Sequence, residues 1–444
     1  MDSSGLGKPG DRWRAVHPQP EPAPGPAPEP PPLTGGPSPA PGGTPAPDLP
    51  LSPDPVTIEA GGAADPAAPA DPAARAARQE PVWRDHVLAD AIVPTIVLHV
   101  GIFIAGFVLV MVFRPENLTV DPFGIWAHWD APHFFEIARF GYGPPADPAR
   151  IVLFPFFPGL IAIGALVTSP LAAGMIVSFA TTLLAAVAVY RLAREDYGRR
   201  TARASIVALN LFPTAFTFVA PYSEAPFLAF VAWSLVRARE DDWRGAGAFA
   251  LLASVTRLQG AFLIPALGIE YLVRHRRLGP ELKWLAMALL GPLIYLGINV
   301  VTFGNPLKFI EVQRTVFHVQ NINPIDALKG LVTGVLKPGW NESWLTVYVA
   351  PLAAEILLAV VVIWACRSFR RRPADATYAL LTLVSLATLS WPISLPRYVL
   401  GIPGLFVFVG RGLARRALAP YVVALLTMLL TVCLTLFVIG HWAF

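Results

Sequence analysis

The feature that most constrains this chain is a series of apolar runs that carry almost no charge. Three runs, Ala91–Phe113, Trp284–Phe303 and Ala419–Gly440, are each near the ~20 residues that an α-helix needs to cross the hydrocarbon of a bilayer. Shorter runs lie between them: Leu171–Tyr190, Ala204–Pro221, Ala225–Val236, Gly245–Thr256, Ala261–Val273, Leu345–Ala365, Ala376–Leu395 and Tyr398–Gly410. Short runs can still cross when they tilt or lie inside a helix bundle. The pattern predicts an all-α, polytopic membrane protein.

Composition narrows the class of partners. Of the 444 residues, 54% are apolar and only 14% are charged, against about a quarter charged in a typical soluble domain. The net charge of +4 sits in short clusters between the apolar runs, which is typical of membrane topology rather than nucleic-acid binding. Cys366 and Cys433 form no disulfide framework and no zinc spacing. We expect membrane lipids as partners, no nucleic acid, no metal and no cofactor.

The amino-terminal residues 1–81 differ from the rest of the chain. They contain 22 of the 47 prolines and almost no large apolar side chains. Such a segment cannot bury enough surface to offset its chain entropy. We therefore expect a disordered Pro/Ala-rich cytoplasmic tail over residues 1–81, and a transmembrane domain over residues 82–444.

Charge distribution sets the predicted topology. The segment Ile151–Val167 is ambiguous because prolines interrupt its start. If it does not cross, five short loops fall on the cytoplasmic side with 19 Lys and Arg residues, whereas the longer outer loops 114–150 and 304–344 carry 7. If it did cross, these clusters would face outward, against the positive-inside rule. We therefore expect about eleven spans, a re-entrant or interfacial helix at Ile151–Val167, and an outer carboxyl terminus. In a bacterium the membrane would be the plasma membrane.

Asp130 is the first candidate for chemistry. It lies in the first outer loop among tryptophans and tyrosines, which suit the headgroup level of a membrane. An acid there could act as a general base and take the proton of an attacking sugar hydroxyl. The pattern of Asp130, Pro132 and Gly141 is also typical of a helix with an N-cap and a glycine stop. Both interpretations stay open.

A second acid, Glu224, follows Ser223 in a tight outer turn between two apolar runs. Ser223 could cap the following helix, with Glu224 in the first turn. Alternatively, Glu224 could line an outer cavity and orient an acceptor hydroxyl or a cationic partner.

Two arginines interrupt apolar sequence on the same predicted face. Arg257 breaks the stretch from Ala246 to Leu267, where a guanidinium is costly and marks either a site or a buried pair with Glu224. Arg397 breaks another run beside Tyr398, either as an interface anchor or as a phosphate contact. The planar guanidinium fits phosphate oxygens well.

Two further acids lie within apolar runs. Glu270 precedes Arg274 by four residues, so a helix-surface pair explains it. Glu355 lies in the middle of Leu345–Ala365 and is either a hydrogen-bonded structural acid or a proton-relay group.

Five motifs follow one another along residues 85–440: Trp129-Asp130…Ile137-Ala138…Gly141-Tyr142, Phe154-Pro155-Phe156-Phe157-Pro158, Ala220-Pro221-Tyr222-Ser223-Glu224, Thr256-Arg257 and Pro396-Arg397-Tyr398. In this order the chain resembles the PIG-V-like mannosyltransferases. These are integral-membrane GT-C glycosyltransferases, related to the enzyme that adds the second mannose of the GPI anchor. The resemblance implies a GT-C-type bundle of transmembrane helices.

The resemblance also implies an activity. It indicates a polyprenyl- or dolichyl-phosphate-linked mannose donor, an inverting transfer to a lipid-linked, glycan or protein acceptor, and Asp130 as the catalytic base. Arg257 and Arg397 would then stabilise the leaving phosphate. The side chains expected to bind substrate are Trp129, His133, Tyr222, Glu224, Arg257, Arg397 and Tyr398.

Two other functions stay open from the sequence alone. A transporter or lipid flippase would use the same acids and arginines along its path, with Glu355 as a proton relay. A non-catalytic scaffold would present the proline-rich tail to a cytoplasmic partner.

Overall fold

The computed structural model describes residues 84–113, 121–144, 147–337, 339 and 341–443. Within this part of the chain the regular structure is helical, apart from one isolated bridge between Asn321 and Leu389. The predicted tail, residues 1–81, lies outside the described residues.

The helices fall into two stretches of the chain. The first stretch contains α3 (Arg84–Val87), η1 (Leu88–Ile92), α4 (Val93–Phe113), η2 (Gly124–Trp126), α5 (Asp130–Phe140), η3 (Pro148–Val152), α6 (Phe156–Gly164), α7 (Pro170–Leu211), η4 (Ala215–Phe218), α8 (Glu224–Arg239) and α9 (Trp243–Thr256). The second contains η5 (Leu258–Phe262), α10 (Leu263–His275), η6 (Pro280–Leu289), α11 (Leu290–Phe303), α12 (Lys308–Thr315), α13 (Pro324–Leu336), α14 (Glu342–Trp344), η7 (Leu345–Val349), α15 (Ala350–Arg367), α16 (Pro373–Ala387), α17 (Leu395–Tyr398), η8 (Val399–Gly401), α18 (Pro403–Leu413) and α19 (Ala419–Val438).

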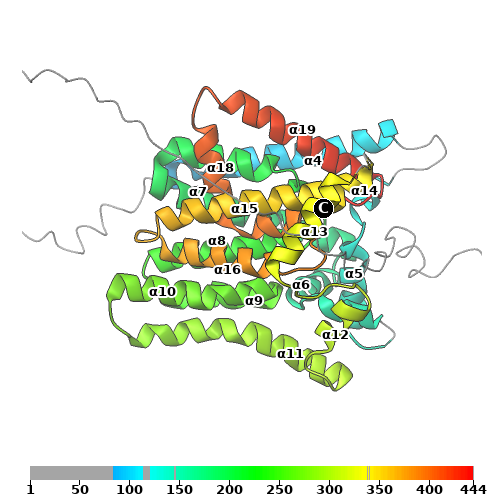
Figure 1. Ribbon diagram of the computed structural model, residues 1–444, viewed down its shortest axis with the longest axis horizontal. Coiled ribbons are helices and arrows are strands. Elements are labelled where there is room, and N and C mark those ends of the chain that lie inside the picture. The colour runs from blue at the N-terminus through cyan, green and yellow to red at the C-terminus, as the bar shows by residue number, and fades with distance from the viewer. Residues whose placement is uncertain (1–83, 114–120, 145–146, 338, 340, 444) are drawn as a thin grey trace, which may run out of the picture. The chain divides into compact units, whose positions relative to one another are not determined.

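The long helices lie side by side (Figure 1). The connections α10–η6, α15–α16 and α18–α19 lie at one end of the bundle, and α5, α6, α12, α13 and α14 gather at the other, which we call the α5 end. The core forms where α7 packs against α18 and α8, and α8 against α9. Helix α8 is buried along nearly its whole length.

Membrane-spanning character is clear in several helices. Five segments of the described chain are long and apolar enough to cross a membrane: Leu88–Phe113, Pro170–Leu211, Pro280–Phe303, Glu342–Arg367 and Ala419–Val438. Apolar side chains such as Met111, Val301 and Leu425 are exposed on these segments. Apolar surface on this scale is covered by lipid in a membrane protein. The described residues thus form a helical membrane protein with several apolar spans.

The longest segment, α7, contains two arms. Gly198 lies inside it with φ 79° and ψ 174°, a conformation that is essentially restricted to glycine. Ser178, before the break, donates to the Tyr222 carbonyl at 3.4 Å, and Thr214, after it, donates to the Pro396 carbonyl at 2.9 Å. Tyr222 and Pro396 both lie beside Arg397, so the chain reverses near Gly198 and the two arms pack against each other's neighbours.

The ambiguous segment Ile151–Val167 forms short elements at the α5 end. It contains the end of η3 and the nine-residue α6, which rises only about 13 Å. That is less than half of the ~30 Å hydrocarbon thickness. Helix α6 packs against α5 and α7, which agrees with a segment that does not cross.

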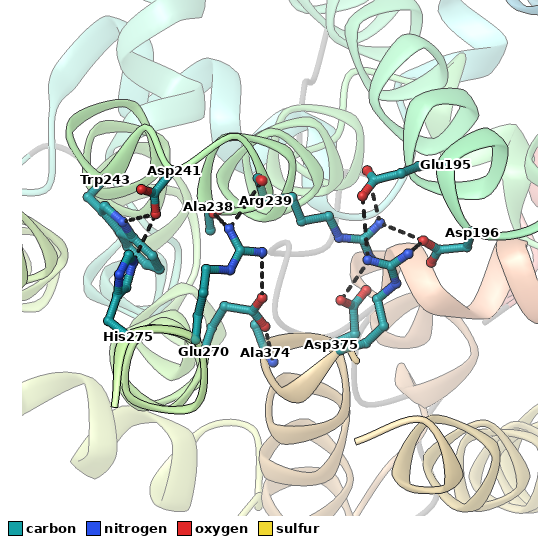
Figure 2. A network of polar contacts seen from close by, with 12 residues as sticks. Glu195, Asp196, Ala238, Arg239, Asp241, Trp243, Glu270, His275, Ala374 and Asp375 are labelled. Atoms are coloured by element: carbon teal, nitrogen blue, oxygen red, sulfur yellow. Dashed lines mark hydrogen bonds and ion pairs between the residues drawn. The ribbon is translucent and has the colours of Figure 1, made fainter. Parts of the chain in front are cut away.

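A charged network joins helices at the opposite end of the bundle (Figure 2). Arg239, the last residue of α8, is buried and contacts Asp196 at 3.2 Å and Asp375 at 2.9 Å. Arg372 also pairs with Asp196. The network ties α7, α8 and α16 together.

Glu270 belongs to the same end. It pairs with Arg274 at 3.2 Å, which confirms the predicted i,i+4 contact. Its other oxygen accepts a hydrogen bond from the Ala374 backbone N–H at 3.0 Å, so the acid also holds the start of α16. Figure 2 shows both contacts.

Candidate active site

The four unusual polar residues of the sequence meet at the α5 end. Asp130 is the first residue of α5, Glu224 the first residue of α8, and Arg397 lies in the short helix α17. Arg257 stands between α9 and η5 in an extended conformation, φ −154° and ψ 150°, because α9 ends at Thr256. We call these four side chains the acid–arginine cluster.

Arg397 is the centre of the cluster. Its Nη1 donates to Oδ2 of Asp130 at 2.6 Å, and its Nε lies 2.9 Å from Oε1 of Glu224. Burial alone would lower the pKa of Arg397, but the charges of Asp130 and Glu224 raise the pKa above its ordinary value. The guanidinium therefore stays charged and joins two acids from different helices.

Arg257 contacts the same acid from another side. Its Nη2 donates to Oε1 of Glu224, and its Nε donates to Oγ of Ser223 at 3.0 Å. Ser223 occupies the N-cap position of α8, but its hydroxyl makes no capping hydrogen bond. The capping interpretation of Ser223 is therefore wrong, because its hydroxyl accepts from Arg257 instead. The predicted pair between Arg257 and Glu224 is present.

Asp130 does not cap α5. The N-cap is Trp129, which makes no side-chain capping bond, and the Asp130 carboxylate turns to Arg397. The predicted glycine stop is present, since Gly141 ends the helix with φ 71°. Trp129 has φ 55° and ψ −105°, an uncommon backbone for a bulky residue. Strain of this kind costs on the order of 1–3 kcal/mol and concentrates at functional sites.

Aromatic rings enclose the cluster. The Arg397 guanidinium lies 5.4 Å from the Tyr222 ring centroid, and that of Arg257 lies 5.4 Å from the Tyr398 ring. Tyr222 is fully buried, and its hydroxyl donates to the His128 carbonyl at 2.8 Å. Burial, with the charge of Asp130, raises the pKa of Tyr222 well above its usual value. Tyr222 therefore supports the loop of Asp130 from behind.

Exposure separates the four charged side chains. Glu224 is 1% exposed, Arg397 5%, Arg257 14% and Asp130 23%. Two acids balance two arginines, so the cluster has no formal net charge. The most exposed acid, Asp130, is the group that an incoming hydroxyl can reach, and the buried members hold it in place.

His133 lies one turn after Asp130 in α5. Burial lowers the pKa of its ring, while the charge of Asp130 raises it and that of Arg150 lowers it. Its Nδ1 is buried without a hydrogen-bond partner among the described residues. Near it, Arg150 of η3 pairs with Glu136 at 2.5 Å. Sequence analysis missed Arg150 and Glu136, because one arginine in a polar loop carries no signal of its burial.

The carboxyl-terminal residues also reach the site. Trp442 packs edge-to-face on Trp129 with ring centroids 5.0 Å apart, and His441 pairs with Glu342 of α14. Sequence analysis did not identify these contacts, since a chain terminus gives no pattern. They place an aromatic wall beside the residue that precedes Asp130.

Glu355 lies elsewhere, within α15, and is half-buried. It is not part of the acid–arginine cluster. No group of three or more His, Cys, Asp or Glu side chains suited to a metal ion occurs among the described residues.

A protein-family model described as dolichyl-phosphate-mannose-protein mannosyltransferase matches residues 152–297 of this chain. The matched range runs from η3 to α11 and includes Glu224 and Arg257, whereas Asp130 and Arg397 lie outside it. No curated protein sequence matches the chain.

Two solved membrane enzymes have a similar arrangement. The apo structure of ArnT from Cupriavidus metallidurans aligns with a TM-score of 0.43 and 16% identity, over 78% of this chain and 77% of that one. The apo oligosaccharyltransferase from Archaeoglobus fulgidus aligns with a TM-score of 0.41 and 15% identity, over 78% of this chain and 56% of that one. At these TM-scores the likeness does not by itself establish a shared fold.

Proposed function

We propose that this protein is a membrane glycosyltransferase of the GT-C type, which transfers a sugar from a polyprenyl-phosphate donor. The observation that carries the proposal is the acid–arginine cluster, in which Arg397 holds the exposed Asp130 at 2.6 Å. The family model over residues 152–297 supports a lipid-phosphate sugar donor and favours mannose. The PIG-V-like motifs point to the same class and belong to this proposal.

The proposed reaction is a single displacement. An acceptor hydroxyl oxygen forms a bond to the anomeric carbon, and the bond from that carbon to the phosphate oxygen breaks. The polyprenyl phosphate leaves with the electron pair, and Asp130 takes the hydroxyl proton. Displacement from the face opposite the phosphate inverts the anomeric centre.

The other cluster residues have supporting roles in the proposal. Arg397 is a positioning residue, because its transfer to a phosphate would weaken the pairing of Glu224, which is buried. Arg257 keeps Glu224 paired from the second side. This differs from the expectation that both arginines contact the donor phosphate. Trp129 and Tyr398 are proposed to line the substrate groove.

A topology follows from the arrangement of the helices. We propose about eleven crossings, with the two arms of α7 counted separately and α6 lying at the interface. The basic turns gather at the end opposite α5 (Figure 1), so the positive-inside rule places the α5 end outside. The proposed donor therefore presents its sugar at the outer leaflet.

The experiment that tests the function is a transfer assay with the purified protein in lipid nanodiscs. The donors are radiolabelled polyprenyl-phosphate mannose and a nucleotide-linked mannose, each offered with a panel of lipid, glycan and peptide acceptors. Transfer from the polyprenyl-phosphate donor alone supports the proposal. Proton-coupled solute or lipid movement without sugar transfer, lost on Glu355→Gln, would instead favour a transporter.

A further inference from the structure

Helix α5 carries a second polar contact one and two turns beyond Asp130. Asp130, His133 and Glu136 are spaced three residues apart, so they follow one stripe of the helix. Arg150, from the neighbouring η3, pairs with Glu136 at 2.5 Å. The stripe therefore leads from the proposed base to another buried arginine.

Arg150 and His133 have unused polar atoms. The Arg150 side chain is 10% exposed, and its Nε is buried without a hydrogen-bond partner among the described residues. The Nδ1 of His133 is in the same situation. Buried polar groups are nearly always hydrogen-bonded, so two such atoms near each other indicate a missing acceptor.

The backbone that carries Arg150 is fixed. Tyr295 of α11 donates to the Ile151 carbonyl, and Tyr142 donates to the Leu153 carbonyl at 2.7 Å. Phe154 stacks on Tyr295 with ring centroids 4.0 Å apart. Arg150 is thus held on a rigid strap, which is what a binding group needs.

The two arginine sites differ in how easily each can exchange its partner. Glu224, which holds Arg397 and Arg257, is fully buried and could not be rehydrated if an arginine left it. Glu136 is 44% exposed and can turn to water when another anion arrives. Arg150 is therefore the arginine that can accept a new anion at low cost.

We propose that Arg150 and His133 bind the phosphate of the polyprenyl-phosphate donor, with Glu136 occupying that place when the donor is absent. This inference rests on the proposed function. Neighbouring side chains on a helix stripe lie about 5–6 Å apart, which is the scale of one sugar ring. The phosphate would then lie on one side of the anomeric carbon and Asp130 on the other.

The test measures binding of a sugar-free polyprenyl phosphate to the full-length protein in nanodiscs. Arg150→Gln removes the proposed contact and should weaken binding by about tenfold or more. Glu136→Gln removes the competing carboxylate and should tighten binding by about threefold or more. Arg139→Gln, on the exposed face of the same helix, is the control and should leave binding unchanged. Thermal melting shows that each variant is folded.

The opposite changes in the first two variants are what a structural ion pair would not give. If Arg150 only stabilises α5, both variants weaken binding together or neither changes it, and the inference is overturned. Inorganic phosphate and vesicles of phosphatidate are the other probes. Equal affinity for either one would overturn the assignment to a polyprenyl donor.

Failure of this inference can be told from failure of the proposed function. Sugar transfer by the wild-type protein, with Arg150→Gln binding polyprenyl phosphate normally, removes the inference and leaves the function. Binding that depends on Arg150, without sugar transfer to any acceptor, keeps the site and removes the glycosyltransferase.

Discussion

Arg397 Nη1 lies 2.6 Å from Asp130 Oδ2, although the two residues are separated by 267 positions in the sequence. The same guanidinium reaches Glu224 through its Nε at 2.9 Å. One planar group therefore fixes the first turn of α5 against the first turn of α8. Because the guanidinium uses two different nitrogens, its shape as well as its charge is needed.

This geometry predicts the effect of a conservative substitution. Arg397→Lys keeps the positive charge but offers a single ammonium, which cannot contact Asp130 and Glu224 in the same directions. Misplacement of a catalytic group by about 1 Å can cost on the order of a hundredfold in rate. We expect kcat for sugar transfer to fall by about that factor, with a smaller change in donor KM. A variant with wild-type kcat would show that Arg397 does not position Asp130.

Removal of the shared acid should be costly in another way. Glu224→Gln leaves Arg257 and Arg397 with one carboxylate between them in a buried place. Breaking a buried ion pair from one side typically costs about 3–5 kcal/mol. We expect a clear loss of thermal stability in detergent, and partial recovery in the double variant Glu224→Gln/Arg257→Gln. No recovery in the double variant would mean that the two residues are not energetically coupled.

His133 predicts a pH dependence of stability. Burial lowers the pKa of its ring in the folded protein below the ordinary value of 6.5. Above pH 6.5 the ring is neutral in both states and this contribution is fully present. Below that pH the unfolded chain takes up the proton first, so stability falls until the pH passes the lower folded pKa. Melting temperatures from pH 7 to pH 5 should fall less steeply for His133→Gln than for the wild type, and equal slopes would exclude this source.

The carboxyl-terminal aromatic wall predicts a measurable coupling. Trp442 and Trp129 meet edge-to-face at 5.0 Å, an arrangement worth about 0.5–1.5 kcal/mol beyond burial. A double-mutant cycle with Trp129→Ala and Trp442→Ala should give a coupling of that size in unfolding free energy. Trp442→Phe should retain most of it. A coupling near zero would separate the carboxyl terminus from the site.

Gly198 predicts a backbone effect far from the site. Its φ of 79° with ψ of 174° suits only glycine, so Gly198→Ala should destabilise the protein by about 1–3 kcal/mol. Gly268 lies inside α10, and no heavy atom lies within 4 Å of the position that an alanine methyl group would take there. Gly268→Ala is therefore the matched control and should be neutral or slightly stabilising. Equal effects of both substitutions on thermal unfolding would contradict the turn within α7.

The sequence predicted the parts of this site that carry an unusual signal. Asp130, Glu224, Arg257 and Arg397 were identified because charged residues are rare at the edges of apolar runs. The structure brings these four together, while their roles in catalysis stay predictions. The helical membrane class followed from the apolar runs in the same way.

Other features could not be read from local sequence. Arg150 lies in a polar loop, and its burial depends on α5 and on Tyr295, which are distant in the chain. Whether Asp130 caps its helix depends on whether Arg397 is near, and local patterns carry no such information. The contact of Trp442 with Trp129 likewise depends on where α19 ends.

The sharpest test of Asp130 as the catalytic base compares two acids at the α5 end. Asp130→Asn removes the proposed base, and Asp326→Asn removes an exposed acid in α13 that pairs only loosely with Lys329, at 3.9 Å. Single-turnover transfer from polyprenyl-phosphate mannose, with donor binding measured in parallel, separates chemistry from binding. We predict that Asp130→Asn binds donor normally but transfers sugar at least about a hundredfold more slowly, while Asp326→Asn is unchanged. Transfer by Asp130→Asn at the wild-type rate would show that another group takes the proton.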